Sequence, residues 1–324
     1  MYQESECIIT WDPESGDFQN SLLPEKHFPF QKLTVGDVIG RGAFGVVYQG
    51  WATPVDGTTE KRVAVKMLKD GASLEENDAI RAEFEQMLYV GDHPNVIGLF
   101  GACSNKGDFM IVMEYAPLGN LLSYLKRQAE CGNYNVYDDT DIVMDKDMIS
   151  IAWQISKGMC HLEKLKCLHR DLASRNVLMG ENMVAKISDF GLAREVYESG
   201  YYFKETKGRL PYRWMSPESL LNGRYTNKSD VWSYGIVLWE MSTLGSVPYP
   251  GILPENMYNI LMSGFRMTKP TGCTTEIYNI MLHCWAQVPD DRPNFEYLEE
   301  RLATILESLC DEEYLKMAPY TENV

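Results

Sequence analysis

The chain has 324 residues, of which 45% are hydrophobic and 23% charged, so it is long enough for two lobes or domains around a sizeable core. Its formal net charge of -16 argues against nucleic-acid binding as the main activity, because a phosphate backbone attracts the opposite charge. The eight cysteines show no CxxC pair and no regular spacing, which is typical of reduced cysteines and excludes a disulfide framework or a zinc site.

Residues 1–32 are polar and acidic, with isolated apolar residues and the prolines Pro24 and Pro29. No hydrophobic period persists, so we expect a flexible or loosely docked lead-in segment. The first residues lack the basic region and the apolar run of a signal peptide. Nowhere in the chain is there a run of about 18 apolar residues, so we expect no membrane span within it.

A glycine-rich turn follows, between two strand-like stretches that begin at Leu33. The arrangement is G-x-G-x-x-G-x-V, and it consists of Gly40, Gly42, Gly45 and Val47. Glycine lets the main chain approach a phosphate closely and point its N–H groups at the anion. Dinucleotide-binding folds have a similar pattern, but there the glycines open a helix, whereas the valines and the tyrosine after Gly45 favour a strand. A glycine-rich hairpin without a ligand is the alternative.

A lysine inside an apolar strand is the next unusual feature. Lys66 lies in RVAVKML, and a buried lysine needs a partner. The following helix has an apolar face, which consists of Ile80, Phe84, Met87 and Leu88. Glu83 lies beside that face and is a candidate partner, with Glu76 and Glu85 as competitors.

Two more strands are predicted in HPNVIGLFGAC and FMIVMEYAPLGNL, and the second ends in a polar connection that contains a glycine. Asn120 is the expected cap of a helix with Leu121, Leu122 and Leu125 on its apolar face. The polar, acidic residues of about 130–146 then interrupt the pattern between two helices, which predicts a mobile surface loop.

The stretch LHRDLASRNVLMGENMVAKISDFG, from Leu168 to Gly191, contains two aspartates on short predicted loops, Asp171 and Asp189. His169, Arg170, Arg175 and Asn176 stand near the first of them. The spacing matches the catalytic-loop and DFG motifs, so the chain resembles a protein kinase. At least six elements occur in kinase order between Gly40 and Glu218, so an isolated pair of turn aspartates does not explain the pattern.

The resemblance implies an α+β, bilobal protein kinase fold, with a small β-rich N-lobe that contains one helix and a larger, mainly helical C-lobe. Its implied boundaries are a juxtamembrane-like lead-in over 1–32, a kinase domain over 33–309 and a C-terminal tail over 310–324. Within the domain, the N-lobe covers 33–113, the hinge 114–119, and the C-lobe 120–309 with an insert at about 130–146.

The resemblance also assigns roles to single residues. Asp171 would accept or orient the proton of the substrate hydroxyl, and Arg175 lies four residues after it. Lys66, paired with Glu83, would clamp the phosphates of ATP, and Asn176 with Asp189 would hold Mg²⁺ or Mn²⁺. The implied nucleotide-binding residues are Ile39, Gly40, Gly42, Gly45, Val47, Ala64, Lys66, Met113, Glu114, Ala116, Asn120 and Leu178. Two structural contacts are implied as well: Asp230 with the main chain of the catalytic loop, and Arg292 with Glu218.

The hydroxyl that is phosphorylated is predicted from two positions. Kinases of the serine/threonine class have a lysine two residues after the catalytic aspartate, where this chain has Ala173, and its cation stands two positions later, at Arg175. Pro211 falls where tyrosine kinases place a proline against the substrate ring, so the prediction is a tyrosine kinase. The pattern is most similar to the receptor kinases of the fibroblast and vascular endothelial growth factor type. Three departures from it remove no catalytic group; they are Ser174, Ser216 and Tyr212.

The same resemblance implies regulation and partners. Tyr201 and Tyr202 match paired activation-loop tyrosines, and phosphates there would meet the basic neighbours Arg170, Arg194 and Lys204. Tyr314-x-x-Met317 looks like a docking motif for SH2-domain proteins. We expect protein substrates that contain tyrosine, no nucleic-acid partner, and the cytoplasmic side of a single-pass plasma-membrane receptor that dimerises through parts outside this chain.

Other classes of protein remain as alternatives. A soluble non-receptor tyrosine kinase fits the same motifs. A catalytically silent signalling scaffold usually lacks Lys66, Asp171 or Asp189, and all three are present. A dinucleotide-dependent dehydrogenase shares the glycine loop but needs a strand–loop–helix context and lacks the HRD and DFG motifs.

Overall fold

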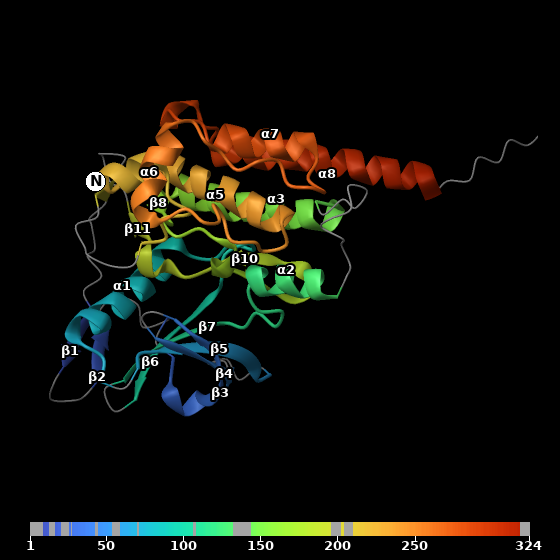
Figure 1. The fold of residues 1–324 in the computed structure, drawn as a ribbon. Coiled ribbons are helices and arrows are strands. Elements are labelled where there is room, and N and C mark those ends of the chain that lie inside the picture. The colour runs from blue at the N-terminus through green and yellow to red at the C-terminus, as the bar shows by residue number, and fades with distance from the viewer. Residues whose placement is uncertain are drawn as a thin grey trace, which may run out of the picture. The chain divides into compact units, whose positions relative to one another are not determined.

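A five-stranded antiparallel sheet is formed by apolar stretches between Leu33 and Glu114 (Figure 1). Its strands in spatial order are β3 (Leu33–Arg41), β4 (Val46–Ala52), β5 (Lys61–Met67), β7 (Asp108–Glu114) and β6 (Leu99–Asn105). Each neighbouring pair is antiparallel, and β6 is an edge strand.

The computed structural model describes most of the chain, in separate ranges of residues. These are 9–12, 17–20, Lys26, 28–42, 45–53, 59–69, 71–105, 108–131, 144–195, 202–203 and 210–317. Contacts divide the chain into two units, the first with residues 1–92 and 97–116 and the second with residues 93–96 and 117–324.

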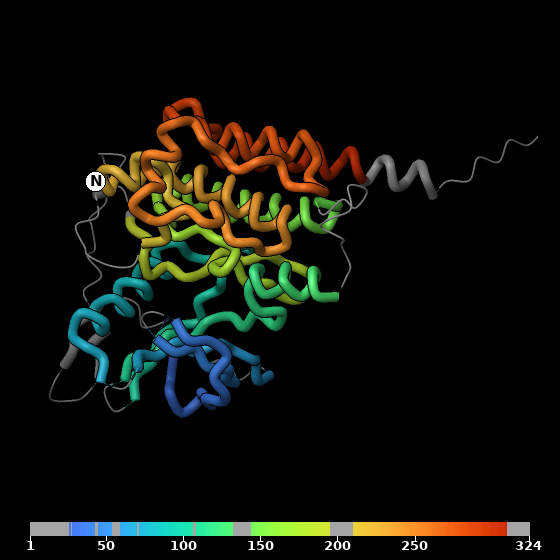
Figure 2. The backbone as a smooth tube through the Cα atoms, in the orientation of Figure 1, coloured from blue at the N-terminus to red at the C-terminus, as the bar shows by residue number. Residues whose placement is uncertain are grey.

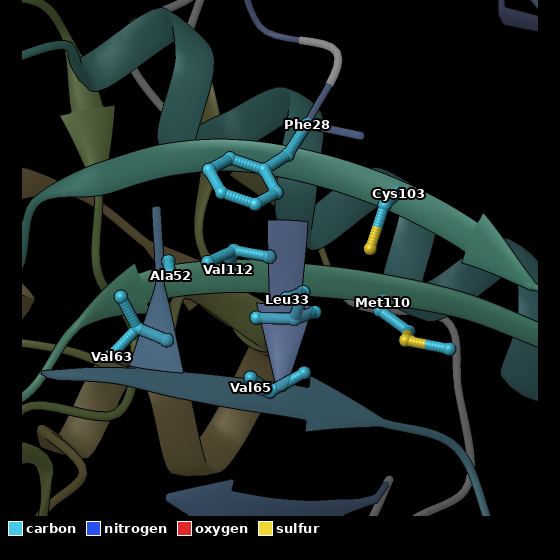
Figure 3. Close-up of a cluster of buried hydrophobic side chains, with 8 residues drawn as sticks. All are labelled: Phe28, Leu33, Ala52, Val63, Val65, Cys103, Met110 and Val112. Carbon is cyan, nitrogen blue, oxygen red and sulfur yellow. The ribbon is translucent and has the colours of Figure 1, made fainter. Parts of the chain in front are cut away.

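One cluster of buried hydrophobic side chains in the first unit lies on one side of the sheet (Figure 3). Its buried side chains are Phe28, Leu33, Ala52, Val63, Val65, Cys103, Met110 and Val112. Phe28 is only 6% exposed, and its N–H donates to the carbonyl of Ala102 at 2.8 Å. The lead-in segment also contains a short hairpin, β1 (Ile9–Asp12) paired with β2 (Asp17–Asn20), and a turn of 3₁₀ helix, η2 (Phe30–Lys32).

These features correct the prediction of a flexible or loosely docked lead-in, which is wrong around Phe28. A single buried aromatic residue such as Phe28 produces no hydrophobic periodicity in the sequence. Strands of four residues are too short for a reliable alternation of apolar and polar residues, so the sequence predicted neither the buried Phe28 nor the hairpin.

Helix α1 (Leu74–Val90) belongs to the first unit. Ile80, Phe84 and Met87 are buried, as the periodicity predicts. The helix begins with a capping box, in which the Ser73 Oγ accepts the Glu76 N–H at 3.2 Å and the Glu76 Oε2 accepts the Ser73 N–H at 2.8 Å. Because Glu76 caps the helix, it is not the partner of Lys66.

The second unit is mainly helical. Its helices are α2 (Leu121–Glu130), α3 (Lys146–Lys164), α4 (Pro217–Asn222), α5 (Asn227–Ser242), α6 (Pro254–Met262), α7 (Thr275–Cys284) and α8 (Phe295–Met317). Helix α5 is buried almost all round, as its apolar sequence predicts. It packs against α3 and α7, and α8 packs along α3, so these helices lie side by side (Figures 1 and 2).

Short strand pairs and 3₁₀ turns connect these helices. The pairs are β8 (Cys167–Leu168) with β11 (Arg194–Glu195), β9 (Val177–Met179) with β10 (Ala185–Ile187), and β12 (Tyr202–Phe203) with β13 (Arg224–Tyr225). The turns are η3 (Ser174–Asn176), η4 (Glu181–Met183), η5 (Phe190–Leu192) and η6 (Pro289–Asp291).

The predicted α+β fold is confirmed: a sheet-rich part with one helix is followed by a larger helical part. Helix α8 extends to Met317, beyond the predicted end of the domain at residue 309. Residues 132–143, in the predicted insert, lie outside the described residues. Within the described part of the chain, no helix is long and apolar enough to cross a membrane.

Candidate active site

The glycine-rich turn connects β3 and β4. The N–H of Gly42 donates to the carbonyl of Gly45 at 2.9 Å, which closes the turn. At Gly45 a Cβ atom would lie 2.4 Å from the Met67 carbonyl oxygen, so the position requires glycine. Gly40 pairs with Val47 across the hairpin. The turn is therefore part of a β-hairpin and does not open a helix, which excludes the dinucleotide-binding arrangement.

Lys66 and Glu83 form the predicted ion pair. The Lys66 Nζ lies 2.5 and 2.6 Å from the two carboxylate oxygens of Glu83. The side chains are 12% and 4% exposed, so water screens the pair poorly. The pair fixes the ammonium group at one place on the surface of the sheet.

The register of the sheet places four of the predicted nucleotide-binding residues on one face. Val47 is opposite Lys66 across β4 and β5, and Ala64 is opposite Met113 across β5 and β7. Opposed residues of an antiparallel pair point to the same side, and so do residues two apart in one strand. Ile39 is 47% exposed on β3, beside a register shift between Val38 and Gly40.

The predicted hinge begins where β7 ends. The Glu114 N–H donates to the Gly98 carbonyl at 2.8 Å, and the Glu114 Oε2 accepts the Gly98 N–H at 3.1 Å. The main-chain N–H and the carboxylate of Glu114 are therefore both bonded within the first unit. Ala116 ends the first unit.

Asn120 and Leu178 lie in the second unit and form an isolated antiparallel bridge. The Asn120 Oδ1 accepts the Ser123 N–H at 2.8 Å, so the predicted helix cap is present at the start of α2. The Asn120 Oδ1 is therefore engaged in capping α2.

The loop that contains Asp171 is anchored on α5. Asp230, which is 2% exposed, accepts the main-chain N–H groups of His169 and Arg170, both at 2.9 Å, as predicted. His169 accepts the Asp171 N–H at Nδ1, so its Nε2 carries the proton and donates to the Ser188 carbonyl at 3.1 Å. Arg170 has a φ of 68°, a left-handed conformation that non-glycine residues adopt rarely.

The carboxylate of Asp171 is held from both sides. The Arg175 Nη2 pairs with its Oδ1, and the Asn176 Nδ2 donates to its Oδ2 at 2.9 Å and to its carbonyl at 2.7 Å. Burial raises the pKa of Asp171 above its ordinary value, while Arg175, His169 and Asn176 act in the opposite direction. His169, Arg175 and Asn176 therefore hold Asp171 in one orientation, on a loop that Asp230 anchors. Asp171 is thus an oriented proton acceptor.

Asn176 and Asp189 are connected through Ser188. The Ser188 N–H and Oγ–H both donate to the Asn176 carbonyl at 2.9 Å, and Asp189 follows with a φ of 65°. Because the Asn176 Nδ2 bonds to Asp171, its Oδ1 is the atom available to a cation. An amide oxygen and a carboxylate are hard donors that suit Mg²⁺, which binds proteins through one or two such groups and substrate phosphates. Among the described residues there is no cluster of three or more His, Cys, Asp or Glu that could hold a metal ion.

Two further contacts concern the end of the activation segment. Arg292 donates to both carboxylate oxygens of Glu218 at 2.6 and 2.9 Å, so the predicted ion pair is present. Arg170, a predicted phosphate neighbour, is 5% exposed; it donates to the Leu192 carbonyl at 2.9 Å and stacks 4.5 Å from the centre of the Tyr225 ring. Tyr201 lies outside the described residues, and the main chain of Tyr202 pairs with Tyr225.

Comparisons with known proteins agree with this geometry. The profile of the family "protein tyrosine and serine/threonine kinase" matches residues 33–302, so the chain belongs to this family. It is 43% identical over 302 residues, or 91% of its length, to a protein of Pleurodeles waltl named fibroblast growth factor receptor 1. The chain spans 37% of the length of that relative. The predicted resemblance to receptor-type tyrosine kinases is confirmed.

Proposed function

We propose that this chain is a catalytic domain that transfers the γ-phosphoryl group of ATP to tyrosine hydroxyls of proteins. The observation that carries the proposal is the arrangement of Asp171, with Arg175 and Asn176 on its two carboxylate oxygens. Phosphoryl transfer depends on positioning and charge neutralisation more than on covalent chemistry, and these groups provide both.

Each predicted residue has one task in this scheme. Asp171 orients the hydroxyl and accepts its proton, and Lys66, fixed by Glu83, binds the phosphates. A bound Mg²⁺ supplies charge neutralisation on those phosphates, and Asn176 and Asp189 would hold it. We also propose that the base and ribose side of ATP contacts Ile39, Val47, Ala64, Met113, Glu114, Ala116, Asn120 and Leu178, with Gly40, Gly42 and Gly45 over the phosphates.

The preference for tyrosine is inferred from the space beside Asp171. Ala173 has no side chain that reaches past its Cβ, whereas a lysine there would crowd a phenol. The cation of this chain is instead at Arg175, whose guanidinium stacks 4.3 Å from the centre of the Trp214 ring. A tyrosine, which is longer than serine, then approaches Asp171 past the small side chain of Ala173 and not past a lysine.

The test is transfer from ATP, with Mg²⁺, to two peptides that differ only in tyrosine or serine at one position. We expect transfer to the tyrosine peptide, and a loss of about 10²- to 10⁴-fold in Asp171→Asn with nucleotide binding retained. Asp291→Asn, an exposed aspartate in η6, is the matched control and should behave as the wild type. Wild-type protein that binds ATP but phosphorylates neither peptide would identify a silent scaffold; preference for serine would refute the specificity.

The chain's wider setting is part of the same proposal. We infer a cytoplasmic position within a single-pass receptor, because the relative that it matches is named as a receptor and the chain spans 37% of its length. Autophosphorylation at Tyr201 and Tyr202, SH2-domain partners at Tyr314 and dimerisation through other parts of the receptor belong to this setting. Mass spectrometry after incubation with ATP tests the two tyrosines, and their absence from the phosphorylated sites would refute this regulation.

A further inference from the structure

A buried carboxylate outside the predicted site lies against the catalytic loop. Glu240 of α5 is 2% exposed and accepts three hydrogen bonds. Two come from Ser174, its N–H at 3.0 Å and its Oγ–H at 2.7 Å, and the third comes from the Trp214 Nε1–H at 3.0 Å. Burying a carboxylate is costly unless its oxygens are satisfied, so these donors form a built site for it. Burial raises the pKa of Glu240, and the bonds from Ser174 and Trp214 lower it.

Both residues that donate to Glu240, Ser174 and Trp214, are neighbours of Arg175. Ser174 precedes Arg175 in η3, and the Trp214 ring supports the guanidinium at 4.3 Å from the ring centre. Arg175 in turn pairs with the carboxylate of Asp171. Two paths therefore connect the carboxylate of Glu240 to Arg175, and Arg175 contacts Asp171. One path runs through the main chain of Ser174, and the other runs through the Trp214 ring.

Helix α5 also holds Trp214 by its main chain, because the Ser233 Oγ donates to the Trp214 carbonyl at 2.7 Å. Asp230, Ser233 and Glu240 are separated by three and seven residues, so they lie on one face of the helix. Asp230 fixes the start of the catalytic loop, and Glu240 fixes its middle.

We propose that Glu240 is a positioning residue for phosphoryl transfer, which fixes Arg175 through Ser174 and Trp214 and thereby orients the carboxylate of Asp171. The inference rests on the proposed function and adds to it a residue without contact to substrate. A displacement of about 1 Å at the reacting groups can reduce a rate by about 10²-fold. The loss of the contacts of Glu240 should therefore have a measurable effect on the rate of transfer.

The Ser174 hydroxyl is the part of this network that departs from the kinase pattern, which usually has alanine there. The hydroxyl contributes one of three bonds to Glu240, and the bonds from the Ser174 N–H and Trp214 remain without it. Its removal should therefore have a smaller effect than the loss of the carboxylate.

The experiment measures single-turnover transfer to a tyrosine peptide, with kcat and the KM values for ATP and peptide. Glu240→Gln turns an N–H₂ group toward N–H or O–H donors, and we expect kcat to fall by about 10- to 100-fold with the KM for ATP within about two-fold. Ser174→Ala should lower kcat by about two- to five-fold in the same manner. Glu276→Gln is the matched control, because Glu276 at the start of α7 pairs with Arg301 of α8, and the change should leave kcat unchanged.

A double-mutant cycle with Arg175→Ala separates positioning from general damage to the fold. If Glu240 acts through Arg175, Glu240→Gln adds less than about two-fold in the Arg175→Ala background. Multiplying effects, or a Glu240→Gln kcat equal to that of the wild type, would overturn the inference. If the Glu240→Gln variant fails to bind ATP, the Ser174→Ala variant becomes the test. A kcat of Ser174→Ala equal to that of the wild type would then overturn the inference. An inactive wild-type enzyme would instead refute the proposed function itself.

Discussion

Lys66 and Glu83 show how a single buried charge is stabilised in the sheet. Both carboxylate oxygens of Glu83 lie within 2.6 Å of the ammonium, and both side chains are nearly inaccessible. A pair of this kind adds little net stability compared with apolar residues of the same volume, because desolvation offsets the attraction between the charges. The pair is therefore better explained by the position it gives Lys66 than by the stability of the fold.

This difference can be measured. Glu83→Ala leaves a buried ammonium without its carboxylate, and we expect a loss of about 3–5 kcal/mol in the free energy of unfolding. Lys66→Met/Glu83→Leu should recover most of that loss while abolishing transfer activity. Denaturant unfolding of both variants provides the measurement, with Asp78→Ala, an exposed residue of α1, as the control. A double variant as unstable as Glu83→Ala would mean that the charges themselves hold the sheet together.

The contact between Lys66 and Glu83 shows what a local pattern can predict. Lys66 interrupts an apolar strand, and Glu83 lies beside an apolar helix face, so periodicity made both candidates, and the resemblance to kinases chose Glu83 over Glu76 and Glu85. Glu240 has no such local pattern. It is 66 residues from Ser174 in the sequence and lies in a helix that is apolar almost all round, so only the folded structure brings the two together.

At the scale of elements, the lead-in segment is the main difference from the sequence prediction. Phe28 lies in the buried cluster beside the sheet (Figure 3). The Lys26 Nζ donates to the Leu99 carbonyl of the edge strand at 3.3 Å. Gly101 makes this approach possible, because a Cβ atom there would lie 2.3 Å from the Lys26 carbonyl oxygen. Residues before the predicted boundary at Leu33 therefore cover one edge of the sheet, which protects it from unwanted pairing.

We expect Phe28→Ala to destabilise the first unit by about 3–5 kcal/mol, because it removes a fully packed aromatic side chain from the core. Phe100→Ala is the control on the same edge strand, since Phe100 is 41% exposed and should cost much less. Thermal unfolding of the two variants tests this directly. Equal effects would indicate that Phe28 contributes no more than an exposed ring.

Element length decides what could be predicted of the rest. The long helices α3 and α8 contain several turns of periodic apolar residues, and α5 is apolar almost all round, so each gives a signal that is longer than one turn. The nine residues of α6 and the four-residue strands of the first hairpin are too short for a period to be distinguished from chance. Their positions depend on tertiary contacts, which a local pattern does not contain.

At the scale of the whole molecule, the chain leaves the first unit after Asp92, contributes four residues to the second, and then returns. Asn95 holds this crossing within the second unit: its Nδ2 donates to the Ala185 carbonyl at 3.0 Å, and its carbonyl accepts the Ile187 N–H at 2.9 Å. Each unit has its own buried core, so each should respond separately to local damage.

Arg292 offers the test in the second unit. Its guanidinium donates to Glu218 and to the carbonyls of Ala286 and Lys228, both at 2.9 Å, and stacks 5.0 Å from the centre of the Trp232 ring. Arg292→Met removes all of these donors and leaves the Glu218 carboxylate without its cation. We expect faster amide hydrogen exchange in α4, α5 and η6, with the protection of the five-stranded sheet unchanged.

The opposite pattern is expected for Phe28→Ala, in which exchange should increase in β3, β5 and β6 while the helices of the second unit keep their protection. Mass spectrometry of the exchanged peptides resolves the two patterns, because the peptides of each unit are distinct in sequence. If each substitution instead accelerated exchange in both units to the same degree, the two cores would open as one cooperative body. The stability of the glycine turn and Lys66 would then depend on the helices that support Asp171, and a substitution in either unit would act on the whole catalytic machinery.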